Sequence, residues 1–139
     1  MQEVISGAGC WPLLDMFEGA GTKLDFFTHT VRREVDGIVV GGFAFTGEGA
    51  ETIQLHFVGT NKRWMTRALL RAVFTYAFQE RKNRVILGYI APDRPHAVKA
   101  ALKLGFKELV VIPAVDIHMM AMTREQCKWV DASIRGVNG

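Results

Sequence analysis

The sequence predicts a mixed α/β (α+β) domain with a mostly antiparallel sheet of six or seven strands and one central parallel pair, flanked by a long central helix and shorter helices. Three observations indicate this class. Short alternating segments separated by turn signals fill the first third of the chain. Residues 51–106 read as strand, helix, strand and short helix, a crossover that joins parallel strands right-handedly. Two β-rich segments follow, and the 139 residues are expected to form one domain, 1–139.

The first third predicts a shortened N-terminal strand and helix within residues 1–23, followed by an antiparallel meander. The expected elements are a strand at 1–5, a helix at 10–17, and strands at 24–35, 38–45 and 51–58. Asp36-Gly37 is a strong hairpin signal, because glycine tolerates the positive φ that a twist-matching turn requires. Gly41-Gly42 inside an apolar strand suggests a β-bulge or a close backbone approach.

The long helix is predicted to begin directly after this meander. Thr60 or Asn61 can serve as its N-cap, and positive charge at 82–84 suits its C-terminal end. Two apolar stripes at helical spacing predict a helix packed on two sides rather than lying on a surface. Three basic residues run between the stripes, four apart: Arg63, Arg67 and Arg71.

The last part predicts a buried strand at 84–90 and a helix that Asp93 can cap, with Pro95 in its first turn. Gly105 stands where a left-handed C-cap is needed. Strands are expected at 107–112 and 117–122. A capping-box spacing at Thr123 opens the C-terminal helix and tail, residues 124–139. The apolar last strand could pair with a second copy, so a homodimer is one expectation.

Composition and charge exclude several functions. A net charge of +3 is too mild for nucleic-acid binding by itself, whereas the local basic cluster fits a compact anion. Two isolated cysteines indicate a reducing compartment, and no His, Cys or carboxylate spacing predicts a metal site. There is neither a signal-peptide pattern nor an apolar run near the roughly 20 residues of a membrane helix. The expectation is a cytoplasmic protein without a membrane partner.

The order of elements from Leu24 to Thr123 resembles the GNAT superfamily of acyl-CoA N-acyltransferases. The best local match is Ala97-Val-Lys-Ala-Ala-Leu-Lys-Leu-Gly-Phe106, which is similar to the family helix that ends in "k-x-G-F". The compact N-terminal part is similar to that of short phage-encoded members. The resemblance implies transfer of an acyl group from acetyl-CoA, or another acyl-CoA, to an amine on a small molecule or a protein.

The resemblance also implies where the cofactor lies. Its pantetheine arm would occupy a gap between the strand at 55–58 and the strand at 85–90, with its pyrophosphate on the start of the long helix beside Lys62 and Arg63. The implied cofactor-binding residues are Leu55, Phe57, Val58, Asn61, Lys62, Arg63, Trp64, Thr66, Arg67 and Arg94. The family's small loop residues are replaced by Trp64 and Thr66, and its tyrosine acid by Ala101. Trp64 reads either as a core anchor or as a plug across the cofactor site.

Three residues are candidates for the chemistry. His56, on the opposite parity from Leu55 and Phe57, and Glu51 are candidate bases, and Tyr89 is the nearest phenol for an acid. Each also has a purely structural reading, as a strand histidine, a solvated carboxylate or a strand aromatic. The departures in the loop leave a second function open, a catalytically degenerate GNAT-fold binding or assembly module. A small RNA- or protein-binding domain that uses the arginine stripe is weaker, because exposed interleaved aromatics are absent.

Overall fold

The computed structural model describes residues 2–61 and 63–136. Its centre is a seven-stranded sheet in the order β1-β2-β3-β4-β5-β7-β6, and within it β4 and β5 are the parallel neighbours. In chain order the elements are β1 (Gln2–Gly7), α1 (Trp11–Gly19), β2 (His29–Val35), β3 (Ile38–Thr46), β4 (Thr52–Gly59), α2 (Arg67–Thr75), the π-helix η1 (Tyr76–Glu80), β5 (Val85–Ile90), α3 (Pro95–Leu104), β6 (Lys107–Ile112), β7 (Ile117–Thr123), the 3₁₀-helix η2 (Arg124–Gln126) and α4 (Ala132–Arg135). The predicted fold class is confirmed.

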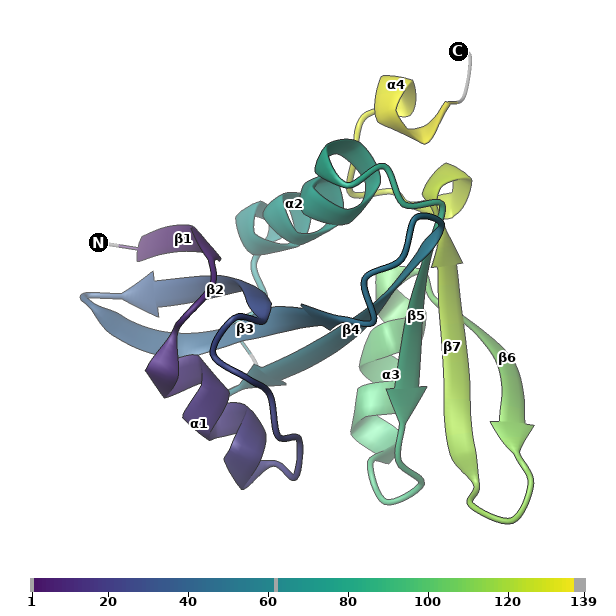
Figure 1. Ribbon diagram of the computed structural model, residues 1–139, viewed down its shortest axis with the longest axis horizontal. Coiled ribbons are helices and arrows are strands. Elements are labelled where there is room, and N and C mark those ends of the chain that lie inside the picture. The colour runs from purple at the N-terminus through teal and green to yellow at the C-terminus, as the bar shows by residue number, and fades with distance from the viewer. Residues whose placement is uncertain (1, 62, 137–139) are drawn as a thin grey trace.

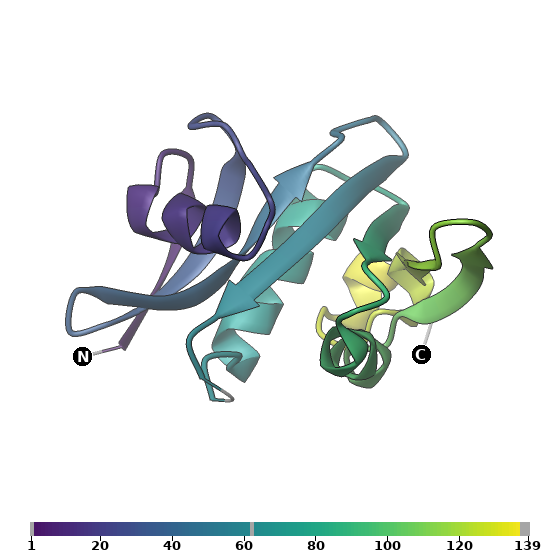
Figure 2. The ribbon, with the colours of Figure 1, turned by 90° about the horizontal axis from the view of Figure 1, so that it is seen from below.

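Helices cover both faces of the β2–β4 part of the sheet, as Figure 1 and Figure 2 show, with α1 on one face and α2 on the other. The period of two along each strand separates the two cores. On β4, Ile53 and Leu55 belong to the cluster under α2, whereas Val58 packs against the cluster under α1. Helix α3 contributes to the α2 cluster through Ala101 and Leu104. The expectation of a central helix buried along two apolar stripes is thus met at Leu69, Leu70, Val73 and Phe74.

The parallel pair is short. Strands β4 and β5 pair only at Thr52–Val85, Ile53–Ile86 and Gln54–Leu87. Beyond these pairs the two strands diverge, and Figure 1 shows β4 running toward α1 while β5 runs down beside α3. The sheet is therefore two antiparallel halves joined at one corner.

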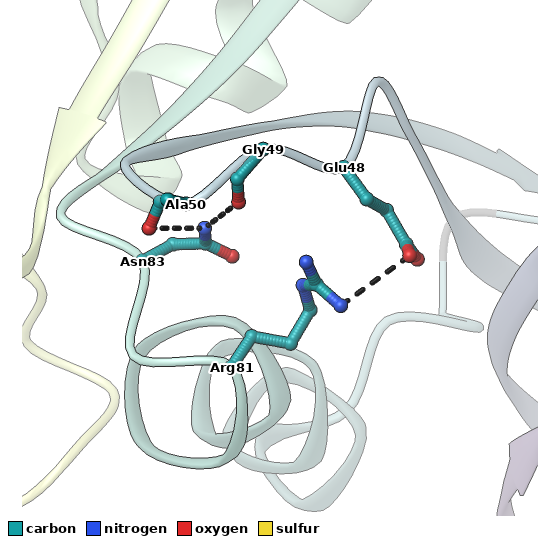
Figure 3. A network of polar contacts seen from close by, with 5 residues as sticks. All are labelled: Glu48, Gly49, Ala50, Arg81 and Asn83. Atoms are coloured by element: carbon teal, nitrogen blue, oxygen red, sulfur yellow. Dashed lines mark hydrogen bonds and ion pairs between the residues drawn. The ribbon is translucent and has the colours of Figure 1, made fainter.

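A polar network closes that corner (Figure 3). The buried amide of Asn83 donates from Nδ2 to the backbone carbonyls of Gly49 at 2.8 Å and Ala50 at 3.3 Å. Arg81 forms an ion pair with Glu48, with 3.3 Å between Nη1 and Oε2. These contacts tie the β3–β4 turn to the segment that follows η1, so β4 and β5 begin together before they separate.

Several local predictions hold. Asp36 and Gly37 both have positive φ, 51° and 80°, as a hairpin of this type requires. The β2–β3 register shifts between Arg33 and Glu34, which confirms a bulge next to the glycine pair. Gly105 is the left-handed C-cap of α3, with φ of 112°.

Other predictions are wrong, and the largest error concerns the long helix. Its N-cap is Thr66 rather than Thr60 or Asn61, with the Thr66 hydroxyl accepting from the Leu69 N–H at 3.2 Å. Residues 60, 61 and 63–66 are instead not helical, because the buried Trp64 ring holds this segment against the sheet. Arg63 is consequently not on the helix with the other two arginines of the expected stripe.

Smaller corrections concern element ends and the sheet edge. β2 begins at His29 rather than Leu24, and the N-cap position of α3 is Arg94, without a side-chain cap from Asp93. The last strand, β7, lies inside the sheet between β5 and β6. The two edge strands are β1 and β6, so a second copy would pair with one of these rather than with β7, and on β6 Leu109 is 58% exposed.

Candidate functional site

A cleft of about 300 Å³ lies where β4 and β5 diverge. Its walls come from β4, the end of β5 with the loop that follows it, α3 with Phe106 after it, Met120 of β7, and the C-terminal end of α1 with the loop that follows it. The lining residues are Phe17, Ala20, Gly21, Thr22, Leu55, His56, Phe57, Gly88, Tyr89, Ile90, Ala91, Asp93, Arg94, Ala97, Ala101, Phe106 and Met120. Five residues of the predicted site thus come together here: Leu55, His56, Phe57, Tyr89 and Arg94.

His56 is the base candidate of the cleft and is partly buried. Its side chain leaves β4 on the face opposite Leu55 and Phe57, and its Nε2 lies 2.7 Å from the hydroxyl of Thr46 on the adjacent strand β3. Burial lowers the pKa of His56 below its ordinary 6.5, because desolvation penalises the charged imidazolium. The imidazole is therefore neutral at pH 7 and able to accept a proton. When Nε2 carries the hydrogen and the Thr46 oxygen accepts it, Nδ1 is the free basic nitrogen.

The β5 side of the cleft carries one phenol and several small residues. Tyr89 lines the opening and is 42% exposed. Gly88, Ala97 and Ala101 line the interior, and a Cβ built on Gly88 would lie 3.9 Å from the Leu55 carbonyl oxygen and from Met120 Cβ. At Gly88 the space between the strands is thus bordered by backbone rather than by a side chain.

Arg94 bridges the mouth of the cleft. Its guanidinium donates from Nη2 to the backbone carbonyl of Ala20, just after α1. It also lies near Gly21, whose added Cβ would be 3.8 Å from Nη2. The β5–α3 loop and the α1–β2 loop are therefore linked across the opening.

Trp64 is a core anchor and not a plug. The residue is 8% exposed and its ring lies 5.3 Å from Phe43 and 6.4 Å from Phe57, measured between centroids. Gly41 and Gly59, paired across β3 and β4, leave the space that the indole fills. The ring is absent from the lining of the cleft.

The loop before α2 places the other predicted cofactor residues outside the cleft. Asn61 accepts from the Arg63 N–H at 2.8 Å through Oδ1. The Arg63 carbonyl accepts from Arg33 Nη1 at 3.0 Å. Thr66 caps α2, and Arg67 is its first residue. Lys62 lies outside the described residues.

Two predicted residues lie elsewhere. Glu51 stands at the closed corner, where its side chain pairs with Arg84 at 3.7 Å and its carbonyl accepts from the Val85 N–H. It does not line the cleft, which makes His56 the better-placed base. Val58 packs under α1 rather than into the opening.

Sequence reasoning missed Thr46, Phe17 and the loop Ala20–Thr22. The turn signal Glu18-Gly-Ala-Gly21 marked a loop, but nothing local showed that it faces β5, some 70 residues away in sequence. Among residues 2–61 and 63–136, no group of three His, Cys, Asp or Glu side chains could hold a metal ion. In the same residues, no helix has the length and apolarity to cross a membrane.

Comparison with solved structures identifies the fold. The yncA protein of Salmonella typhimurium, assigned as an acetyltransferase and solved with acetyl-CoA, superposes with a TM-score of 0.71 at 12% identity, over 88% of this chain and 93% of that one. Ard1 from Thermoplasma volcanium has a TM-score of 0.67 at 13% identity, over 88% and 97%. A variant of the spermidine N-acetyltransferase SpeG from Vibrio cholerae has 0.60 at 16%, over 86% and 75%.

The chain therefore has the GNAT fold, as its resemblance implied. No protein-family model matches the sequence, and no curated protein matches it. At these identities the likeness concerns the architecture alone.

Proposed function

We propose that this protein transfers an acetyl group from acetyl-CoA to an amine. The observation that carries the proposal is the separation of β4 from β5 after Gln54, with a cleft between them. Among the structural neighbours of this fold, SpeG is a spermidine N-acetyltransferase, and yncA is assigned as an acetyltransferase and was solved with acetyl-CoA. The cleft holds a neutral histidine and a phenol, the two side-chain types that such a transfer can use.

The residues present fit a thioester on a narrow amide-bearing arm. On the β5 side, β4 has no ladder partner beyond Gln54, so backbone groups such as the Leu55 carbonyl face the gap. Unpaired backbone donors and acceptors suit the amides of a pantetheine arm. The apolar walls formed by Leu55, Phe57 and Ile90 exclude water from the reacting carbonyl.

The start of α2 is the proposed phosphate end of the site. The first N–H groups of a helix have no intrahelical acceptor. In α2 the Thr66 hydroxyl accepts from the Leu69 N–H, which leaves the N–H groups of Arg67 and Ala68 without a helical partner. They point outward with the positive end of the helix dipole, which favours a diphosphate. The side chains of Arg63 and Arg67 would add charge-assisted bonds.

His56 is the proposed general base. As the amine nitrogen bonds to the thioester carbonyl carbon, the proton leaves the nitrogen for the imidazole. Backbone N–H groups on the unpaired side of β4 stabilise the oxyanion. As the carbon–sulfur bond breaks, the Tyr89 hydroxyl or a water molecule would donate a proton to the leaving thiolate of coenzyme A. Thr46 holds the imidazole in place throughout.

The first experiment measures binding of acetyl-CoA by calorimetry and by thermal unfolding. A ligand that binds only the folded protein raises its stability by mass action. Arg67→Ala should weaken binding, whereas Arg71→Ala is the matched control, since Arg71 lies one turn further along α2 in an exposed ion pair with Asp131. No binding at millimolar acetyl-CoA would refute the proposal.

A second candidate function is a GNAT-fold module that binds acyl-CoA or a partner without turnover. The observation that favours it is Ala101, a methyl group in the cleft wall at the position where the resemblance expects a phenolic acid. Binding of acetyl-CoA without release of free coenzyme A thiol in the presence of amines would support this module instead of the enzyme.

A further inference from the structure

Arg94 is a cation in the cleft wall that has no acidic partner. Within the described part of the chain it forms no ion pair, and its one side-chain hydrogen bond goes to the neutral carbonyl of Ala20. Asp93, the preceding residue, is exposed and also lines the cleft, but it forms no ion pair with Arg94 within the described residues. The remaining lining is mostly apolar. A partly buried guanidinium without an acidic partner favours an anion beside it in the cleft.

The guanidinium is suited to a carboxylate in particular. It presents five N–H donors in a planar fork, of which the Ala20 carbonyl uses one. A carboxylate accepts two of them in parallel, and such charge-assisted pairs are stronger than bonds to a neutral carbonyl. The same fixed positive charge disfavours a second cation in the cleft.

We propose, resting on the proposed transfer, that Arg94 selects an acceptor amine that also bears a carboxylate, with an apolar side chain. Leu55, Phe57 and Ile90 offer the apolar surface, and His56 accepts the amine proton from the opposite wall. The positive charge of Arg94 also lowers the pKa of the bound ammonium, which favours the reactive neutral amine. The acceptor thus differs from the polycation spermidine, the substrate named for one structural neighbour.

The test uses four probes with saturating acetyl-CoA: L-leucine, L-leucinamide, isoamylamine and spermidine. Release of coenzyme A thiol gives kcat and KM for each. Leucine should have the highest kcat/KM, by roughly 10- to 100-fold over isoamylamine, the range expected of a charge-assisted contact. Leucinamide is the stringent comparison, because it lacks the carboxylate of leucine and its amine is the less basic of the two.

The matched variants are Arg94→Gln, Arg94→Lys and, as control, Arg71→Gln on the outer surface of α2. Arg94→Gln should raise the KM for leucine at least about tenfold and leave the KM for isoamylamine unchanged. Arg94→Lys keeps the charge without the fork and should lie between. The resemblance had implied a cofactor contact for Arg94, whereas this proposal assigns Arg94 to the acceptor. The dissociation constant of acetyl-CoA should therefore be the same in all four proteins, and a loss of acetyl-CoA affinity in Arg94→Gln would assign Arg94 to the cofactor instead.

The outcomes separate the two proposals. Failure to bind acetyl-CoA overturns the transfer and the selectivity together. If acetyl-CoA binds, three results overturn the role of Arg94. These are equal turnover of leucine and isoamylamine, a preference for spermidine, and no turnover of leucine. An Arg94→Gln variant that retains the leucine KM also overturns it.

Discussion

The indole of Trp64 lies in the space that Gly59 leaves free on strand β4. A Cβ built on Gly59 would sit 2.1 Å from Cδ1 and Nε1 of that ring, far inside van der Waals contact. Gly41, its cross-strand neighbour, would come within 2.5 Å of the same ring. The two glycines and the tryptophan therefore act as one packing unit that fixes the loop before α2.

This unit predicts a strong coupling between two substitutions. Gly59→Ala should destabilise the protein by roughly 1–3 kcal/mol through overpacking, and Trp64→Ala by roughly 3–5 kcal/mol through the cavity it leaves. In the double variant the alanine methyl has room, so the cost of Gly59→Ala should disappear. Chemical denaturation of the four proteins measures this, and purely additive free energies would contradict it.

A matched glycine serves as the control. Gly19 ends α1, and a Cβ added there meets nothing within 4 Å. Gly19→Ala should leave the free energy of unfolding unchanged or raise it by up to about 1 kcal/mol, because alanine favours helix more than glycine does.

The partly buried His56 predicts a pH dependence of activity. As the general base, His56 acts only when unprotonated, and its lowered pKa keeps it so at neutral pH. The acid limb of the kcat/KM profile should therefore have its midpoint below 6.5, and His56→Gln should reduce kcat by roughly 10²- to 10⁴-fold. Thr46→Val should reduce kcat less, with recovery in Thr46→Ser. An unchanged rate in His56→Gln would exclude the base role.

The same shift predicts a pH dependence of stability. A folded-state pKa below the unfolded value means that the unfolded chain binds the proton more readily. The stability from neutral His56 is thus fully present above pH 6.5 and is lost as pH falls toward the folded pKa. The loss of unfolding free energy on acidification should be smaller in His56→Gln. His29, whose pKa burial also lowers, contributes with the same sign, so His29→Asn is the additive comparison.

Substitution of Gly88 tests whether acetyl-CoA binds in the gap between β4 and β5. A Cβ there makes ordinary contacts at 3.9 Å, so Gly88→Ala should fold normally. Gly88→Val extends into the lining of the cleft and should weaken acetyl-CoA binding by at least about tenfold with little change in Tm, since site shape rather than core packing is altered. Calorimetric titration of both variants measures the difference, and equal affinities would place the ligand elsewhere.

Asn83 predicts an unusually costly isosteric change at the closed corner. Its Nδ2 donates to two carbonyls (Figure 3), so Asn83→Asp places a carboxylate oxygen against two acceptors. Asn83→Asp should therefore destabilise the protein at neutral pH more than Asn83→Ala, which costs roughly 1–3 kcal/mol. A carboxyl group held against two carbonyl acceptors has a raised pKa, so acidification through that pKa should reduce the penalty of Asn83→Asp. Denaturant midpoints at two pH values check the order of the two variants.

The order of strands and helices could be predicted because their signals are local. Alternation along β4, the Asp36-Gly37 hairpin and the Gly105 C-cap each depend on a few adjacent residues, and all were confirmed. The parallel pairing of β4 with β5 followed from the length of the connection between them. His56, Tyr89 and Arg94 were chosen through the resemblance to the GNAT arrangement, and the structure places all three in the lining of the cleft, whereas their roles stay predictions.

The remainder was decided only by tertiary contacts. Residues 60–66 have a helical pattern, but the slot made by Gly41 and Gly59 binds the Trp64 ring, and that burial outweighs local helix propensity. Likewise, Thr46 meets His56 and Ala20 meets Arg94 because strands and loops distant in sequence pack side by side. Sequence periodicity determines which face of an element is buried, whereas the partner that buries it depends on the whole chain.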